Sequence, residues 1–189
     1  MKRLLKKATM TLYHGTCSQR LRDIVASGAI LPSNLTGITS NGVEGSDTEY
    51  GFVGSRNTEG IYLTNIIKAA EGYANAAVYV DEVTPAFPLV IRVNVDDSKL
   101  LPDLDDLGTS FEFTDDTPRW RQSLNYIGQA IYPGKIALEQ ISGVCFSTSL
   151  DDIIGDDALT TEVAKHLHHW YSCEEILAII TDLELQVDN

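Results

Sequence analysis

The sequence predicts a single α+β domain over residues 1–189 with a helical C-terminal part. A chain of 189 residues has about the length of one domain, and it can bury a core without disulfide or metal support. Strand patterns occur, of which residues 88–95 are the clearest because they are β-branched and alternate at their end. Helical spacing of apolar residues recurs at 65–80, 160–171 and 173–182.

The first predicted elements are a strand and a helix. The strand covers Thr11-Leu12-Tyr13 and is expected to break at His14-Gly15-Thr16, where glycine allows a tight backbone. Ser18 is expected to cap a helix over residues 19–27, and Gly28 is a natural C-terminal stop for that helix.

Residues 32–60 are rich in Ser, Thr, Asn and Gly and keep no regular period. They predict a long loop that partly covers a binding site, with a disordered insertion as the alternative. A strand follows at Gly60–Thr64, and Thr64 or Asn65 caps a helix to about residue 80. The predicted apolar face of that helix contains Ile66, Ile67, Ala70, Tyr73, Ala74 and Ala77.

The second half of the chain alternates acidic and apolar segments. The stretch 96–116 holds eight acidic residues and is expected to be a solvated loop. A short helix is predicted at 119–124, and strands at 129–132 and 140–147. The turn Pro133-Gly134 closes the first of these strands.

The net charge of −13 argues against broad contact with nucleic-acid phosphates. It suits a basic partner or a small neutral or cationic ligand, and solubility alone would explain it equally well. The three cysteines are few, odd in number and widely spaced, so a reducing cytoplasm is the expected location. The basic start lacks the apolar region of a signal peptide, and no apolar run is long enough to cross a membrane.

Three features could contribute chemistry. His14 stands at a strand end before Gly15, where a ligand hydroxyl can approach both the ring and the backbone. Tyr62 and Tyr73 could sandwich a planar aromatic ring such as nicotinamide. Gln129 offers a polar group on a later strand. Each feature alone also fits a structural role, as a satisfied histidine or a core aromatic.

Together these stretches resemble the ADP-ribosyltransferase superfamily, in its His-Tyr-Glu branch that includes diphtheria toxin and the poly(ADP-ribose) polymerases. The matching segments are Leu12–Thr16 and Gly60–Thr64, followed by Ala69-Ala70 and by Tyr73, eleven residues after Tyr62. The resemblance covers residues 10–147, so 148–189 form a helical C-terminal extension. It implies a split antiparallel β-sheet core with flanking helices and a cleft for NAD.

The resemblance also implies roles for individual residues. NAD would be the co-substrate, with His14 bonding its ribose hydroxyls and the Gly15 backbone holding the nicotinamide amide. Tyr62 and Tyr73 would line the nicotinamide pocket, and Thr16 would fix the segment that carries the histidine. Nicotinamide would then leave through an oxocarbenium-like state, which the protein stabilises by position and charge.

The family places a glutamate on a late strand, and here Gln129 occupies or adjoins that position. Asn125 is the other candidate if the register shifts by four, and Glu139 is a nearby carboxylate that we do not favour. The resemblance therefore implies mono-ADP-ribosyl transfer to a macromolecule, with a protein favoured over nucleic acid, and no polymer formation. Small members of this kind are often bacterial or phage effectors, toxins or counter-defence proteins.

Two other classes of function compete with this interpretation. The chain could be a catalytically silent module that keeps an NAD cleft, or an acidic inhibitor of a basic partner. An RNA 2′-phosphotransferase shares the His-Gly-Thr strand, but its basic lobe is missing and the charge is wrong for RNA. We expect no metal site: His166, His168 and His169 lack partners at ligand spacing, and the acidic stretch has no calcium-loop pattern.

Overall fold

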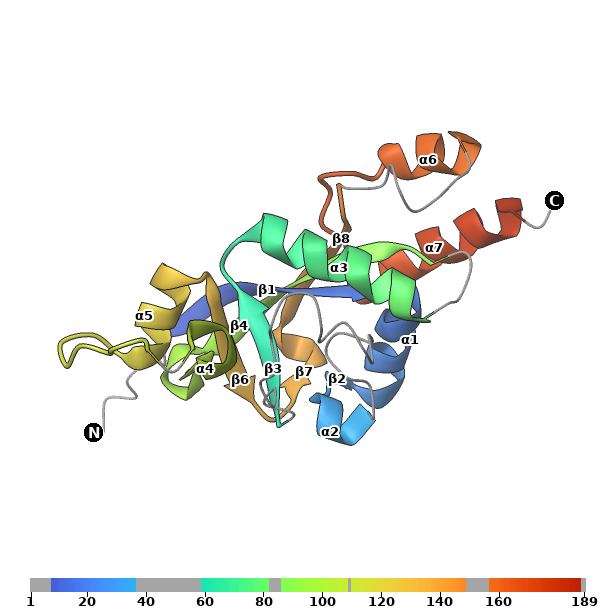
Figure 1. The fold of residues 1–189 in the computed structure, drawn as a ribbon. Helices are drawn as coiled ribbons and strands as arrows, with labels where there is room; N and C mark the ends of the chain where they lie inside the picture. The colour runs from blue at the N-terminus through green and yellow to red at the C-terminus, as the bar shows by residue number, and fades with distance from the viewer. Residues whose placement is uncertain (1–7, 37–58, 82–85, 109, 149–156, 188–189) are drawn as a thin grey trace.

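The computed structural model describes residues 8–36, 59–81, 86–108, 110–148 and 157–187. It confirms the α+β class, with antiparallel strands and helices on their flanks (Figure 1). The central part of the predicted 32–60 loop lies outside the described residues. Its beginning forms a one-turn helix over Ser33–Thr36.

The strands form one large and one small sheet. The large sheet contains β1 (Thr9–Cys17), β3 (Gly60–Thr64), β4 (Pro88–Asp96), β5 (Leu101–Pro102), β6 (Gln129–Pro133) and β8 (Ile141–Phe146). Its order is β5-β6-β3-β1-β4-β8, and all neighbours run antiparallel. The small sheet contains β2 (Ala29–Ile30) and β7 (Ile136–Ala137). The resemblance implied a split antiparallel β-sheet core, and here six strands share one sheet beside a sheet of two.

The large sheet is nearly split between β1 and β3. All nine residues of β1 pair with β4, but β1 pairs with β3 only through Tyr13 and Thr64. The sheet therefore consists of two three-stranded halves, β5-β6-β3 and β1-β4-β8, that meet at one residue pair. Beyond that pair the two strands diverge and leave room between them.

Helices cover both faces and the ends of the sheet. They are α1 (Ser18–Ser27), α2 (Ser33–Thr36), α3 (Ile67–Asp81), α4 (Leu104–Leu107), α5 (Arg119–Tyr126), α6 (Asp157–Ala164) and α7 (Cys173–Val187), with 3-10 turns η2 (Asp97–Lys99) and η3 (Leu138–Gln140). Helix α3 packs on β1 and β4, and α5 packs on β5 and β6 (Figure 1). Helix α7 contacts α1, α6 and β8, which joins the C-terminal part to the sheet.

The central strand β4 is buried on both faces. Leu89 and Ile91 are fully buried in the main core cluster, whereas Val90 packs with Ala70 and Ala74 of α3. Successive side chains of a strand point to opposite faces, so these residues divide between the two layers. This double burial explains the nearly continuous apolar sequence of the strand.

The start of the fold differs from the prediction in two ways. Strand β1 does not break at His14, because His14 pairs with Ile91 and the pairing continues to Cys17. Helix α1 begins at Ser18, whose Oγ accepts a hydrogen bond from the Phe87 N–H instead of capping the helix. Gly28 ends the helix as predicted, with a φ of 77°.

Helix α3 buries a narrower face than predicted. The alanines of the predicted face are buried, but Ile66, Ile67 and Tyr73 are exposed by 49%, 39% and 37%. The small alanine side chains allow the helix to lie close to β1, so only a narrow stripe is covered. Among the described helices, none has the length and apolar character to cross a bilayer.

Two later segments also correct the prediction. The acidic stretch 96–116 is not simply a solvated loop, since it contains η2, β5 and α4, and β5 pairs with β6 at the sheet edge. Helix α6 ends at Ala164 instead of near residue 171. The reason is that the Tyr171 backbone pairs with Val144 of β8, which needs an extended chain.

Candidate functional site

A cavity of about 250 Å³ lies where β1 and β3 diverge. Residues 13–16 of β1 and all of β3 line it, together with residues of α1, α2, β2 and α3. The predicted site residues His14, Gly15, Thr16, Tyr62, Tyr73 and Gln129 are all among its lining residues. The split of the sheet thus brings together groups that are distant in sequence.

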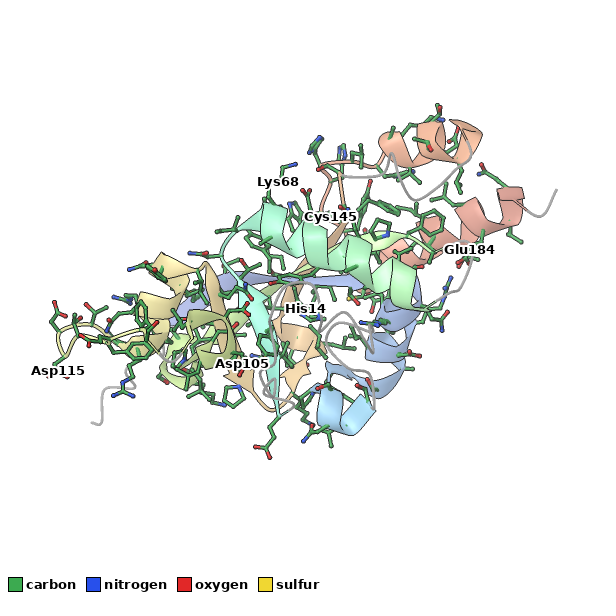
Figure 2. The ribbon with its side chains drawn as sticks, viewed as in Figure 1. His14, Lys68, Asp105, Asp115, Cys145 and Glu184 are labelled. Atoms are coloured by element: carbon green, nitrogen blue, oxygen red, sulfur yellow. The ribbon has the colours of Figure 1, made fainter. Side chains whose placement is uncertain are left out.

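His14 connects the two halves of the sheet. Its Nδ1 lies 3.1 Å from the backbone oxygen of Tyr62 on β3. A carbonyl oxygen can only accept, so Nδ1 carries the proton and Nε2 is the acceptor nitrogen of the neutral ring. Figure 2 shows His14 near the centre of the molecule, below α3.

The surroundings of His14 favour that neutral form. Burial lowers its pKa below the ordinary 6.5, the hydrogen bond to the Tyr62 carbonyl opposes this shift, and the positive charge of Arg20 adds to it. At neutral pH the ring therefore presents Nε2 as a hydrogen-bond acceptor, which suits a ligand hydroxyl.

Tyr62 and Tyr73 reach the cavity from different elements. Tyr62 is half-buried on β3, and its hydroxyl donates a 2.5 Å hydrogen bond to Asp105 of α4. Tyr73 is 37% exposed on α3. Both rings line the cavity, so a flat aromatic group could contact either of them.

Gln129 begins β6 and pairs with Thr64 of β3. Its Nε2 donates a 3.0 Å hydrogen bond to Oδ2 of Asp106, which leaves Oε1 as the acceptor of the amide. Ser123 fixes the backbone of Gln129, because its buried hydroxyl donates a 2.7 Å hydrogen bond to the Gln129 carbonyl oxygen. The same hydroxyl accepts from the N–H of Asp103, where α4 is capped.

Gly15 and Thr16 shape the wall of the cavity on β1. A Cβ on Gly15 would lie 2.2 Å from the Ala70 oxygen and 2.6 Å from the Ala74 nitrogen of α3. Only glycine therefore permits this helix to pack so closely on the strand. Thr16 is 1% exposed and lines the cavity from within β1. The His14 segment that Thr16 was expected to fix is regular strand.

Sequence reasoning missed four charged residues in or behind the cavity wall, one of which, Asp23, is an exposed lining residue of α1. Arg20 lines the cavity from the first turn of α1, where its charge can reach an anionic ligand. Asp105 and Asp106 hold Tyr62 and Gln129 through their carboxylates. The signal for α4 was present, since Asp103 precedes Leu104-Asp105-Asp106-Leu107 as an N-cap residue does.

Other residues considered in the sequence do not reach the cavity. Asn125 on α5 and Glu139 on η3 are exposed, and neither is a lining residue. Cys17 is buried in the core, and the three cysteines are free thiols. His166 donates or accepts a hydrogen bond at the Tyr171 hydroxyl, 3.0 Å away. Within the described residues, no group of three or more His, Cys, Asp or Glu side chains could hold a metal.

The acidic stretch does not form one continuous exposed face. Asp103 is fully buried, and Asp105 and Asp106 are half-buried against Tyr62 and Gln129. Asp115 lies at the far tip of the molecule (Figure 2). Burial raises the pKa of Asp103 to about 6, and the neighbouring Asp106 charge adds to this rise.

Comparison of the chain with protein-family models, curated proteins and solved structures finds no match.

Proposed function

We propose that the protein is an NAD-dependent mono-ADP-ribosyltransferase that modifies a macromolecule, with a protein as the favoured acceptor. One observation carries the proposal: His14, Tyr62, Tyr73 and Gln129 line a single cavity at the split of the sheet. The resemblance of the sequence to the ADP-ribosyltransferases implies the same four residues. The divergence of the two half-sheets is compatible with the split core that the resemblance implies.

The chemistry of the cavity fits NAD as co-substrate. Nε2 of neutral His14 accepts a hydrogen bond from a ribose hydroxyl, and the rings of Tyr62 and Tyr73 contact the nicotinamide. Arg20 offers a positive charge to the pyrophosphate. Cleavage of the bond between nicotinamide and ribose releases nicotinamide, and a nucleophile of the acceptor attacks the ribose carbon. The protein contributes position and electrostatic stabilisation to this step.

A silent NAD-binding module is the second candidate. The feature that favours it is the amide of Gln129, which by the resemblance stands at or near the position of the family's carboxylate, because an amide binds a hydroxyl without supplying negative charge. An acidic inhibitor is less well supported, since the carboxylates of α4 turn toward Tyr62 and Gln129. An RNA 2′-phosphotransferase conflicts with the net charge of −13.

Nicotinamide release and NAD binding by the purified protein test the proposal. We expect release by the wild type and a loss of about a hundredfold or more in His14→Ala, because the variant lacks the ribose acceptor. His169→Ala is the matched control, since His169 is exposed and outside the cavity. NAD binding without release would support the silent module. Neither binding nor release would contradict both candidates.

A further inference from the structure

The cleavage that we propose needs negative charge beside the ribose. The side chains that line the cavity at Gln129 supply little negative charge. Of the described lining residues, Asp23 is the one carboxylate, and it lies exposed on α1. Gln129, which lines the cavity from β6, is neutral. Among the described residues, a negative charge that contacts Gln129 therefore comes from outside the cavity lining, on α4.

Helix α4 places such a charge directly against Gln129. Oδ2 of Asp106 accepts the hydrogen bond from Nε2 of Gln129 at 3.0 Å. A carboxylate that accepts a hydrogen bond from the amide nitrogen polarises the amide group. This makes the amide oxygen a stronger hydrogen-bond acceptor. The half-buried position of Asp106 keeps this effect larger than it would be in water.

The contact between Asp106 and Gln129 is held by buried neighbours. Oδ1 of Asp103 accepts hydrogen bonds from the N–H groups of Asp105 and Asp106 at 3.2 and 3.3 Å, which fixes the first turn of α4. The Ser123 hydroxyl joins the backbone of Asp103 to that of Gln129. The carboxylate of Asp106 and the amide of Gln129 therefore belong to one connected framework.

We propose that Asp106 is a positioning residue that, through Gln129, replaces the missing carboxylate of the site. The carboxylate of Asp106 holds Nε2 of Gln129, so that Oε1 of Gln129 accepts the ribose hydroxyl. The negative charge of Asp106 polarises the Gln129 amide as positive charge develops on the ribose. The inference rests on the proposed function, because its effect appears in that reaction. Tyr62 is held in the same manner, through its hydroxyl, by Asp105.

The test compares Asp106→Asn with the charge-exchanged double variant Asp106→Asn, Gln129→Glu. In Asp106→Asn the hydrogen-bond acceptor remains but the charge is lost, so we expect kcat for nicotinamide release to fall about tenfold. KM for NAD should stay within about twofold, since binding of the ground state depends little on this charge. The double variant restores one carboxylate at the site and should recover kcat.

Asp115→Asn is the matched control, because it removes one charge from the same acidic stretch at an exposed position away from the cavity. Thermal melting of each variant confirms that it folds. A kcat of Asp106→Asn equal to that of the control would overturn the inference and leave the proposed function standing. The same holds if the folded double variant fails to recover kcat. A wild type that releases no nicotinamide would overturn the inference together with the proposed function.

Discussion

The two halves of the large sheet differ in how their strands are held. In the half β1-β4-β8, apolar side chains pack closely: Leu12, Leu89, Ile91 and Val93 are completely buried, and α3 lies directly on Gly15. In the half β5-β6-β3, strands are short and polar groups connect them to α4 and α5. Both halves contribute side chains to the main core, but the second half adds the hydrogen bonds and charges of α4 and α5.

This difference suggests a division of tasks at the cavity. The closely packed half presents His14 from a strand whose nine residues are all paired. The polar half presents Tyr62 and Gln129, each attached to a carboxylate of α4. Electrostatic stabilisation requires groups that are fixed before the reaction begins. Packing fixes the histidine, and the hydrogen-bonded framework fixes the tyrosine and the glutamine.

The largest expected effect concerns the closely packed half. Gly15→Ala places a methyl group against backbone atoms of α3, at 2.2 Å from the Ala70 oxygen. Backbone cannot rotate away as a side chain does, so the helix must shift. We expect the free energy of unfolding to fall by about 3 kcal/mol, at the upper end for overpacking. Denaturant unfolding measures this loss.

Gly72→Ala is the matched control for that variant, because it adds the same methyl group to α3 itself. A Cβ on Gly72 meets no atom within 4 Å. Alanine is the better helix former, so this variant should be more stable than the wild type by about 0.5–1 kcal/mol. If Gly15→Ala unfolds like the wild type, α3 does not lie as close to β1 as described.

An intermediate effect of opposite sign is expected in the polar half, at Asp103. Burial and the charge of Asp106 raise its pKa from 3.8 to about 6, so the folded protein binds this proton more tightly than the unfolded chain. The free energy of unfolding therefore decreases as pH rises from about 4 through 6. Above about pH 6 this loss of stability is complete. Asp103→Asn keeps an acceptor oxygen for the N-cap and has no proton to lose.

We expect Asp103→Asn to be more stable than the wild type by about 2 kcal/mol at pH 7.5, and equal to it or less stable near pH 4. Denaturant unfolding at both pH values measures the difference. The control Asp115→Asn changes an exposed position and keeps Asp103, so it should lose stability with rising pH as the wild type does. A loss of stability at pH 7.5 would mean that the ionised carboxylate is the form that holds α4.

Sequence patterns predicted the elements with strong local signals. Gly28 ended α1, and residues 60–64 and 129–132 formed strands within one residue of the expected bounds. The break predicted at His14-Gly15-Thr16 was wrong, because glycine there serves close packing against α3 instead of a turn. A close approach between distant segments leaves no local pattern that could distinguish these two uses of glycine.

Residues named from the sequence line the cavity, but their charged neighbours were not predicted. His14, Tyr62, Tyr73 and Gln129 were named from short motifs, and all of them line the cavity. Asp105 and Asp106 were assigned to a solvated stretch, since an acidic run is usually exposed. Their contacts depend on the pairing of β5 with β6, which brings α4 to Tyr62 and Gln129. Such long-range pairing follows from the whole sheet and not from the segment.

The smallest expected effect lies between the two halves, at His14. Because its pKa is lowered in the folded protein, the unfolded chain takes up this proton first as pH falls below 6.5. The contribution of His14 is therefore complete above that value and is lost as pH falls toward the lower pKa of the folded state. His14→Asn places an amide N–H where Nδ1 donates to Tyr62 and does not titrate. Denaturant unfolding between about pH 5 and pH 8 should show a steeper loss of stability in the wild type than in His14→Asn. The other three histidines are common to both proteins, so equal slopes would mean that His14 is charged as readily in the folded state as in the unfolded one.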